Sequence, residues 1–179
     1  MDSINRNQTE DNHADLAGAD AVQRVRQTVD KTQSCFLCTQ AGAGPSSGTR
    51  PMSVQQVDDD GTLWFLSASD SHKNAEIAQS PKVQMFFQGS EHSQFMYLTG
   101  HATASTDKAK IKALWKPILK VWFTEGEDDP RITVLEVKPA SGYYWDNKHG
   151  NVVAGVKMLV GAAIGKTMDD SIEGRLDFR

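Results

Sequence analysis

The fold is indicated first by residues 50–67, which run Arg50-Pro-Met-Ser-Val-Gln-Gln-Val-Asp-Asp-Asp-Gly-Thr-Leu-Trp-Phe-Leu-Ser67. Two strand-like runs, residues 50–57 and residues 62–67, flank the segment Asp58-Asp-Asp-Gly61. An Asp-Gly pair between such runs is a strong hairpin signal, because glycine supplies the positive φ that tight hairpin turns need. We therefore expect two antiparallel strands that lie side by side.

Strand-like runs continue on both sides of this hairpin. They cover residues 34–39, 83–88, 95–105, 132–138 and 141–146. The second and third should pair across residues 89–92, and the glycine-rich loop 41–48 should end the first. Six or seven strands joined by tight turns predict a mainly β protein, an antiparallel barrel or sandwich with peripheral helices.

Helical patterns are few. Val22, Val25 and Val29 share one face of a first helix, for which Asp20 is a plausible N-cap. A short helix is expected over residues 72–79, and another begins after Asp107, its predicted N-cap.

Pro117 should kink or shorten that last helix. A further helix, over residues 152–164, should pack on the barrel. This divides the chain into a disordered tail (1–18), the barrel domain (19–150) and a C-terminal helix and tail (151–179).

Composition narrows the possible functions. The chain has 179 residues, room for one domain, and a net charge of -4, which argues against a dedicated nucleic-acid binder. No apolar run approaches the roughly 20 residues of a membrane span, and the first twenty residues lack the apolar core of a signal peptide. We expect a cytoplasmic protein with no membrane partner.

Cys35 and Cys38 have the spacing of a metal-binding pair, but the sequence holds no second pair and no other cluster with metal-ligand spacing. We therefore expect no metal site. The two cysteines are expected to be reduced residues of a strand, one of them buried.

Three short segments suggest an anion-binding pocket: Arg50-Pro-Met-Ser53, Trp64-Phe-Leu-Ser67 and Ser71-His-Lys-Asn74. Arg50 offers a planar fork for a phosphate and Lys73 a point charge, while Ser71 stands where a helix N-terminus adds free backbone N–H groups. The flat side chains of Trp64, Phe65 and Met52 could cover a planar ring. A phosphate-bearing heteroaromatic ligand such as flavin mononucleotide (FMN) fits these groups.

Taken in order, these segments resemble a known family, the general stress protein 26-like branch of the pyridoxamine 5'-phosphate oxidase-like, FMN-binding split-barrel superfamily. The resemblance covers about residues 22–146. Besides the segments quoted above, it rests on Tyr97-Leu-Thr-Gly-His-Ala102, Leu114-Trp115 and Gly142-Tyr-Tyr-Trp-Asp146.

The resemblance implies a split β-barrel that forms a homodimer, with FMN held in clefts at the subunit interface. Arg50 and Lys73 would hold the phosphate, with Ser71 beside them. The ring would meet the backbone of Met52 and Ser53. The remaining cofactor-binding positions carried over from the family are Leu66 and Ser67, which would line the ring and ribityl chain, His72, and Trp145 from a later strand of either subunit.

One position departs from the family pattern. His72 stands where oxidases of the superfamily tend to have a second arginine. A charged imidazole there could supplement Lys73, or it could be a solvent-facing helix start. The departure weakens the case for pyridoxamine phosphate oxidation itself.

The leading hypothesis is an FMN-dependent oxidoreductase of unknown substrate, with a reduced nicotinamide or another electron donor and no assigned catalytic residue. A flavin-binding or flavin-sensing module without turnover is the alternative. A split barrel for a deazaflavin or for haem is another; haem would need an axial ligand such as His101 or His149.

For single residues, simpler interpretations compete with these roles. Arg50 could make a surface salt bridge to Asp58, Asp59 or Asp60. Either Trp64 or Phe65 should be core, with Phe65 favoured, because neighbouring strand residues face opposite ways. Trp115 and Trp122 are expected in packing or dimer contacts.

Overall fold

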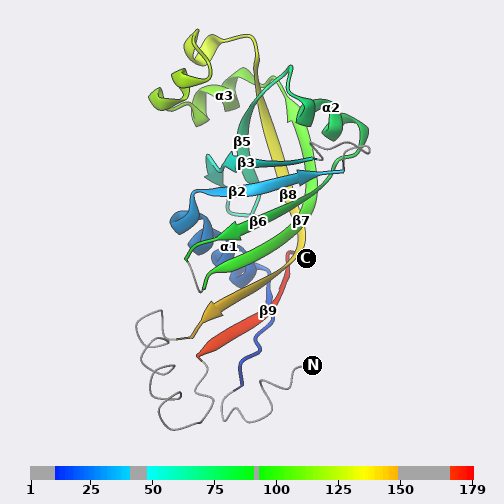
Figure 1. The fold of residues 1–179 in the computed structure, drawn as a ribbon, viewed down its shortest axis with the longest axis vertical. Helices are drawn as coiled ribbons and strands as arrows, with labels where there is room; N and C mark the ends of the chain where they lie inside the picture. Colours follow the sequence, from blue (N-terminus) through cyan, green and yellow to red (C-terminus); the bar gives the residue numbers. More distant parts are fainter. Residues whose placement is uncertain (1–10, 41–47, 91–92, 149–169) are drawn as a thin grey trace.

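The computed structural model describes residues 11–40, 48–90, 93–148 and 170–179, and the structural statements below concern these residues. The chain forms one sheet of nine strands with helices around it (Figure 1). The elements are β1 (Leu16–Ala17), α1 (Ala19–Thr32), β2 (Ser34–Thr39), β3 (Thr49–Ser53), β4 (Gln56–Val57), β5 (Leu63–Ala68), α2 (His72–Gln79), β6 (Lys82–Gln88), β7 (Phe95–Ser105), α3 (Lys108–Leu114), the 3-10 helices η2 (Pro117–Val121) and η3 (Gly126–Asp128), β8 (Ile132–Asn147) and β9 (Ser171–Asp177).

The long strand β8 organises the sheet. It pairs with β7 along one edge. Its other edge is shared, because β5 pairs with residues 132–137 and β9 with residues 141–147. The sheet therefore divides along β8, and from β7 it continues through β6 and β2 to β3, all antiparallel.

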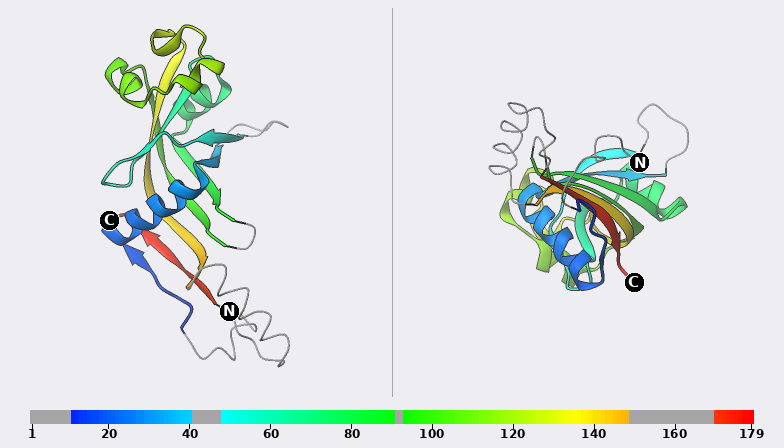
Figure 2. Two further views of the ribbon diagram at one scale, coloured as in Figure 1. Left: turned by 90° about the vertical axis from the view of Figure 1, so that its left-hand side faces the viewer. Right: turned by 90° about the horizontal axis from the view of Figure 1, so that it is seen from below.

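The main core lies inside this curved sheet. Alternate residues of each strand point inward, as in β5, where Leu63 and Phe65 are fully buried while Trp64 is not. Val25 and Val29 of α1 join the same core, so the helix lies against the sheet (Figure 2). The expected core position of Phe65 and the apolar face of α1 are confirmed.

A second, smaller core holds the segment after β7 in place. It consists of Ile111, Leu114, Leu119, Phe123, Ile132 and Val134. We call residues 107–131, which carry α3, η2 and η3, the arm. Asp107 caps α3 as expected, accepting bonds from the backbone of Ala109 and Lys110. Pro117 also acts as expected, because α3 ends at Leu114 and the chain continues as η2.

Polar contacts fix the two ends of the arm. Lys110 Nζ lies 3.8 Å from the centre of the Trp64 ring, and the Trp64 indole donates a 2.7 Å hydrogen bond to Asp58. At the other end, Arg131 forms a fork with Asp129 whose shorter contact is 2.7 Å. This fork lowers the pKa of the Asp129 carboxyl to about 2.

Residues 50–57 do not form one strand, so that prediction was wrong. β3 pairs with β2 and not with β5, while β4 pairs with β5. The chain crosses over between them: the backbone N–H of Val54 donates to Gln33 and that of Gln55 donates to Trp64. Arg50 therefore does not lie in a strand beside Trp64.

Other boundaries also differ from expectation. Gly18, with a φ of 53°, stands at the N-cap of α1 instead of Asp20. The runs 132–138 and 141–146 are parts of the single strand β8.

The chain ends contribute strands that were not expected. β1 falls in the segment assigned to the tail, and β9 in the segment assigned to a C-terminal helix and tail; the two pair in parallel. The helix expected over residues 152–164 lies outside the described residues.

Candidate functional site

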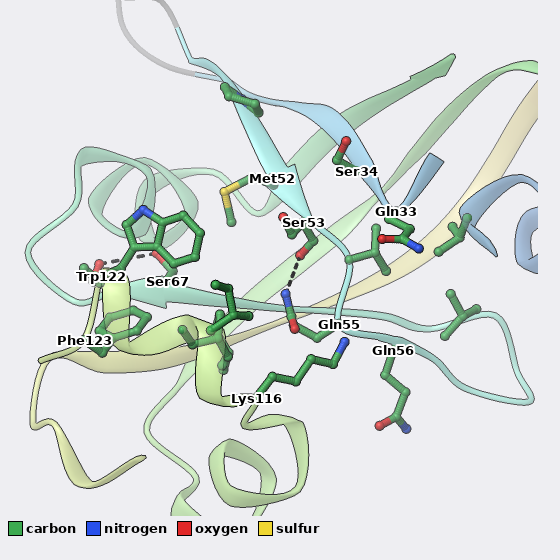
Figure 3. Close-up of a pocket in the computed structure, with 18 of the residues that line it drawn as sticks. Gln33, Ser34, Met52, Ser53, Gln55, Gln56, Ser67, Lys116, Trp122 and Phe123 are labelled. Carbon is green, nitrogen blue, oxygen red and sulfur yellow. Dashed lines mark hydrogen bonds between the residues drawn. The ribbon is translucent and has the colours of Figure 1, made fainter. Parts of the chain in front are cut away.

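A cavity of about 1380 Å³ opens beside the crossover between β3 and β4. Its walls come from β3 and β4, the end of β5, the first turn of α2, the end of α1 and the arm (Figure 3). Five of the predicted cofactor-binding residues line it: Met52, Ser53, Leu66, Ser67 and Lys73. Segments that lie as far apart in the sequence as Arg26 and Phe123 thus meet around one space.

Lys73 is the cation that the cavity receives from α2. In the described part of the chain its ammonium makes no ion pair. Burial lowers the pKa of Lys73, and the nearby Arg50 charge lowers it further, while Glu76 and Asp70 oppose the change. A half-buried ammonium without a carboxylate partner is a position where an anionic ligand group would be stabilised.

A polar network fixes the start of α2 behind Lys73. Ser67 Oγ donates to Asn74 Oδ1 at 3.0 Å and lies 3.2 Å from Ser71 Oγ. Asn74 in turn donates to Thr133 Oγ1 at 2.8 Å. Ser71 is therefore a support of the site that does not itself line the cavity. Asn74 was not singled out from the sequence, although it lies in the segment that was quoted.

Arg50 has a different partner from any expected. Its guanidinium forms a fork with Glu76 of α2, at 2.7 Å to Oε2 and 2.9 Å to Oε1, and Nη1 also donates to Thr39. The alternative interpretation, in which Arg50 makes a surface salt bridge to Asp58, Asp59 or Asp60, is therefore wrong. The hydrogen bond from Arg50 lowers the pKa of Glu76. Arg50 does not line the cavity, but two of its five N–H groups remain unused by these contacts.

His72 and Trp145 lie away from the cavity. His72 is exposed at the start of α2, near the Glu76 carboxylate. Trp145 is 42% exposed and lines a separate groove of about 820 Å³ on the outer face of the sheet. Neither residue lines the cavity that contains Lys73.

The outer groove is markedly aromatic. Phe36, Phe86 and Tyr97 stand in register across β2, β6 and β7, and the Phe86 and Tyr97 rings are 5.0 Å apart. Phe36 and Phe86 are 56% and 43% exposed. Ser34 and Pro51 line both this groove and the cavity, so the two hollows adjoin.

The cavity also contains an unsatisfied acceptor, Gln55 Oε1. The Gln55 amide donates from Nε2 to the carbonyl of Ser53 at 3.2 Å (Figure 3), while Oε1 is buried without a hydrogen-bond partner in the described residues. A buried carbonyl oxygen is costly to leave unpaired. It therefore fits a ligand that brings an N–H donor, as the ring system of a flavin does.

The described residues contain no group of three or more potential metal ligands. They also contain no helix that is long and apolar enough to cross a membrane.

Both cysteines are free, and burial raises the pKa of Cys35 to about 12. The cavity thus offers cations, among them the unpaired Lys73 ammonium, together with hydroxyl groups, an amide and apolar walls.

Comparison with known proteins adds to this geometry. Residues 20–169 match the sequence profile described as pyridoxamine 5'-phosphate oxidase like. The chain belongs to this family. General stress protein 26 of Bacillus subtilis, a family relative, is 27% identical over 124 residues, which cover 67% of this chain and 84% of that protein. Protein bli-3 of Neurospora crassa is 26% identical over 90 residues, 46% of this chain but only 43% of bli-3.

Solved structures support the family's fold for this chain. A general stress protein 26-type structure from Jannaschia sp. CCS1 superimposes with a TM-score of 0.71 at 21% identity, covering 89% of this chain and 99% of that one. The general stress FMN/FAD binding protein from Xanthomonas citri superimposes with a TM-score of 0.56 at 25% identity, covering 66% and 83%. The predicted mainly β split barrel with flanking helices is confirmed.

Proposed function

We propose that the cavity binds FMN, with the phosphate at Lys73 and the ring against Met52, Ser53 and Leu66. The observation that carries this proposal is the unpaired, half-buried Lys73 ammonium at the first turn of α2, in a cavity with an unsatisfied acceptor at Gln55. The membership of the family and the FMN/FAD-binding relative from Xanthomonas citri support the choice of a flavin.

Haem is the weaker candidate. Of the two histidines considered as axial ligands, His101 lines a different, smaller hollow beside Lys82, and His149 lies outside the described residues. A deazaflavin would meet the same phosphate site as FMN. A visible spectrum of the purified protein separates the three ligands, because flavin gives two broad bands, haem gives one intense Soret band, and a deazaflavin gives neither at comparable strength.

We further propose a homodimer that packs through the aromatic groove of β2, β6 and β7. An exposed apolar patch of this kind marks an interaction surface, and a second copy is the partner that the family resemblance implies. Because the groove adjoins the cavity at Ser34 and Pro51, the partner would border the flavin. Trp145, which lies in the groove, would then reach the cofactor of the other subunit.

A flavin held here would supply the electron transfer, and the chain would bind it, orient it and exclude water. Oxidoreductase activity is the function that we propose, with a nicotinamide as one candidate donor. Anaerobic addition of NADH or NADPH tests this directly. Bleaching of the flavin band supports an enzyme, and an unchanged spectrum with both donors favours the flavin-binding module without turnover.

Two variants separate the roles of Arg50. If its free N–H groups also meet the phosphate, Arg50→Met should weaken FMN binding about tenfold, the loss expected for one charged hydrogen bond. Glu76→Gln removes the competing negative charge and should leave FMN binding unchanged or tighten it a few fold. The measurement is FMN affinity from fluorescence quenching. Equal weakening by both variants would mean that Arg50 only holds α2 in place.

A further inference from the structure

The cavity is larger than one cofactor requires. Its volume of about 1380 Å³ exceeds the roughly 300–1,000 Å³ of most small-molecule sites. The residues assigned to the flavin come from β3, β5 and α2. Another part of the wall comes from the arm, which contributes Lys116 and Trp122 from its η2 region (Figure 3). The space on the arm side therefore has no assigned occupant.

Trp122 is an exposed ring on a fixed backbone. Its indole is 61% exposed, yet its neighbours Leu119 and Phe123 are buried in the second core. The backbone N–H of Trp122 donates to the carbonyl of Leu119 at 3.0 Å, and the backbone carbonyl of Trp122 accepts a 3.5 Å bond from Arg131. Within the single chain Trp122 is therefore not packed, and the expected dimer contact stays a prediction. The loop holds an uncovered aromatic face beside the cavity, where another planar ring could stack.

Lys116 brings a positive charge to the same wall. Its side chain extends toward Gln55 and Gln56 in Figure 3, and it makes no ion pair within the described residues. The cavity is lined by three cations, Arg26, Lys73 and Lys116, and by one carboxylate, Asp30. Arg26 is paired with Asp59 at 2.6 Å. After Lys73 is assigned to the phosphate, Lys116 remains for a second anion.

We propose that Trp122 and Lys116 form a second subsite, which takes a planar aromatic molecule that carries a carboxylate. Its ring stacks on the Trp122 indole and its carboxylate meets the Lys116 ammonium. The role of this molecule as the redox partner of the flavin rests on the proposed function. Its binding at the arm requires only Trp122 and Lys116. The inference narrows the substrate class to aromatic carboxylates.

The test is a calorimetric titration of the FMN-loaded protein with 2-naphthoate and with its uncharged analogue 2-naphthamide. Lys116→Gln should weaken naphthoate about tenfold and leave naphthamide unchanged. Trp122→Leu should weaken both ligands by about tenfold, since it removes the stacking surface. Lys120→Gln, which changes an exposed lysine of η2 that does not line the cavity, is the matched control and should alter neither.

Three results would overturn the subsite: no naphthoate binding to the unchanged protein, equal losses in Lys116→Gln and Lys120→Gln, or a dimer that dissociates in Trp122→Leu by light scattering. The last would assign Trp122, with exposed Ile118 and Val121, to a protein interface. Flavin fluorescence in the same samples reports FMN binding separately. Failure to bind FMN overturns the proposed function, and naphthoate titration of the flavin-free protein then still decides the subsite.

Discussion

FMN binding is expected to weaken ten- to a hundredfold when Lys73 is replaced by methionine. The variant keeps most of the length of the side chain but removes the one cation that lines the cavity beside the polar network of α2. Loss of a charged hydrogen-bond partner costs about 1.5–3 kcal/mol, which corresponds to this range of affinity. Fluorescence quenching of FMN, titrated with protein, measures the change.

The effect should belong to the phosphate. Riboflavin, which lacks the phosphate, should bind the Lys73→Met variant and the unchanged protein equally well. Lys73→Arg should recover part of the FMN affinity, because it restores the charge with a different geometry. Lys82→Met removes an exposed lysine that does not line the cavity and serves as the control. Equal FMN affinity in Lys73→Met and Lys82→Met would contradict the assigned phosphate position.

The second large effect is expected at the aromatic groove. Phe86→Asp places a carboxylate in the middle of the row formed with Phe36 and Tyr97. Since Phe86 is 43% exposed in the single chain, the fold should tolerate the change, while a dimer packed through this face should dissociate. Light scattering should report a shift from dimer to monomer, and FMN affinity should fall with it, because the partner borders the cavity.

A matched acidic substitution tests whether position matters. Ser105→Asp introduces the same charge at an exposed residue of β7 outside the groove and should leave the dimer intact. Circular dichroism checks that both variants remain folded. A Phe86→Asp protein that stays dimeric with normal FMN affinity would place the dimer interface elsewhere.

The elements that could be predicted from the sequence are those whose signals are local. Alternation placed Phe65 in the core, Asp107 indicated where α3 begins, and Pro117 indicated that this helix is cut short. The strand β9 carries a comparable signal, because Ile172, Gly174 and Leu176 alternate with charged residues. A side chain at Gly174 would collide with the carbonyl of Ala14, which lies only 1.9 Å from the position of a Cβ. That contact, between the two ends of the chain, has no local signal.

The sequence-based predictions were wrong where contacts between distant segments determine the structure. The break between β3 and β4 depends on hydrogen bonds from Val54 to Gln33 and from Gln55 to Trp64. The Arg50–Glu76 pair likewise joins residues 26 positions apart. Glu76 could have been suspected as the partner of Arg50, because Arg50 was expected near Lys73. Lys73 and Glu76 are three residues apart on α2 and so share a face of that helix. Nothing local indicated that the arm would present Trp122 to the cavity.

The most direct test of flavin binding is a titration of fixed FMN with the purified, flavin-stripped protein. We predict quenching that saturates at one FMN per chain, with tighter binding of FMN than of riboflavin because Lys73 meets the phosphate. Flavin fluorescence that stays constant as protein is added would contradict it.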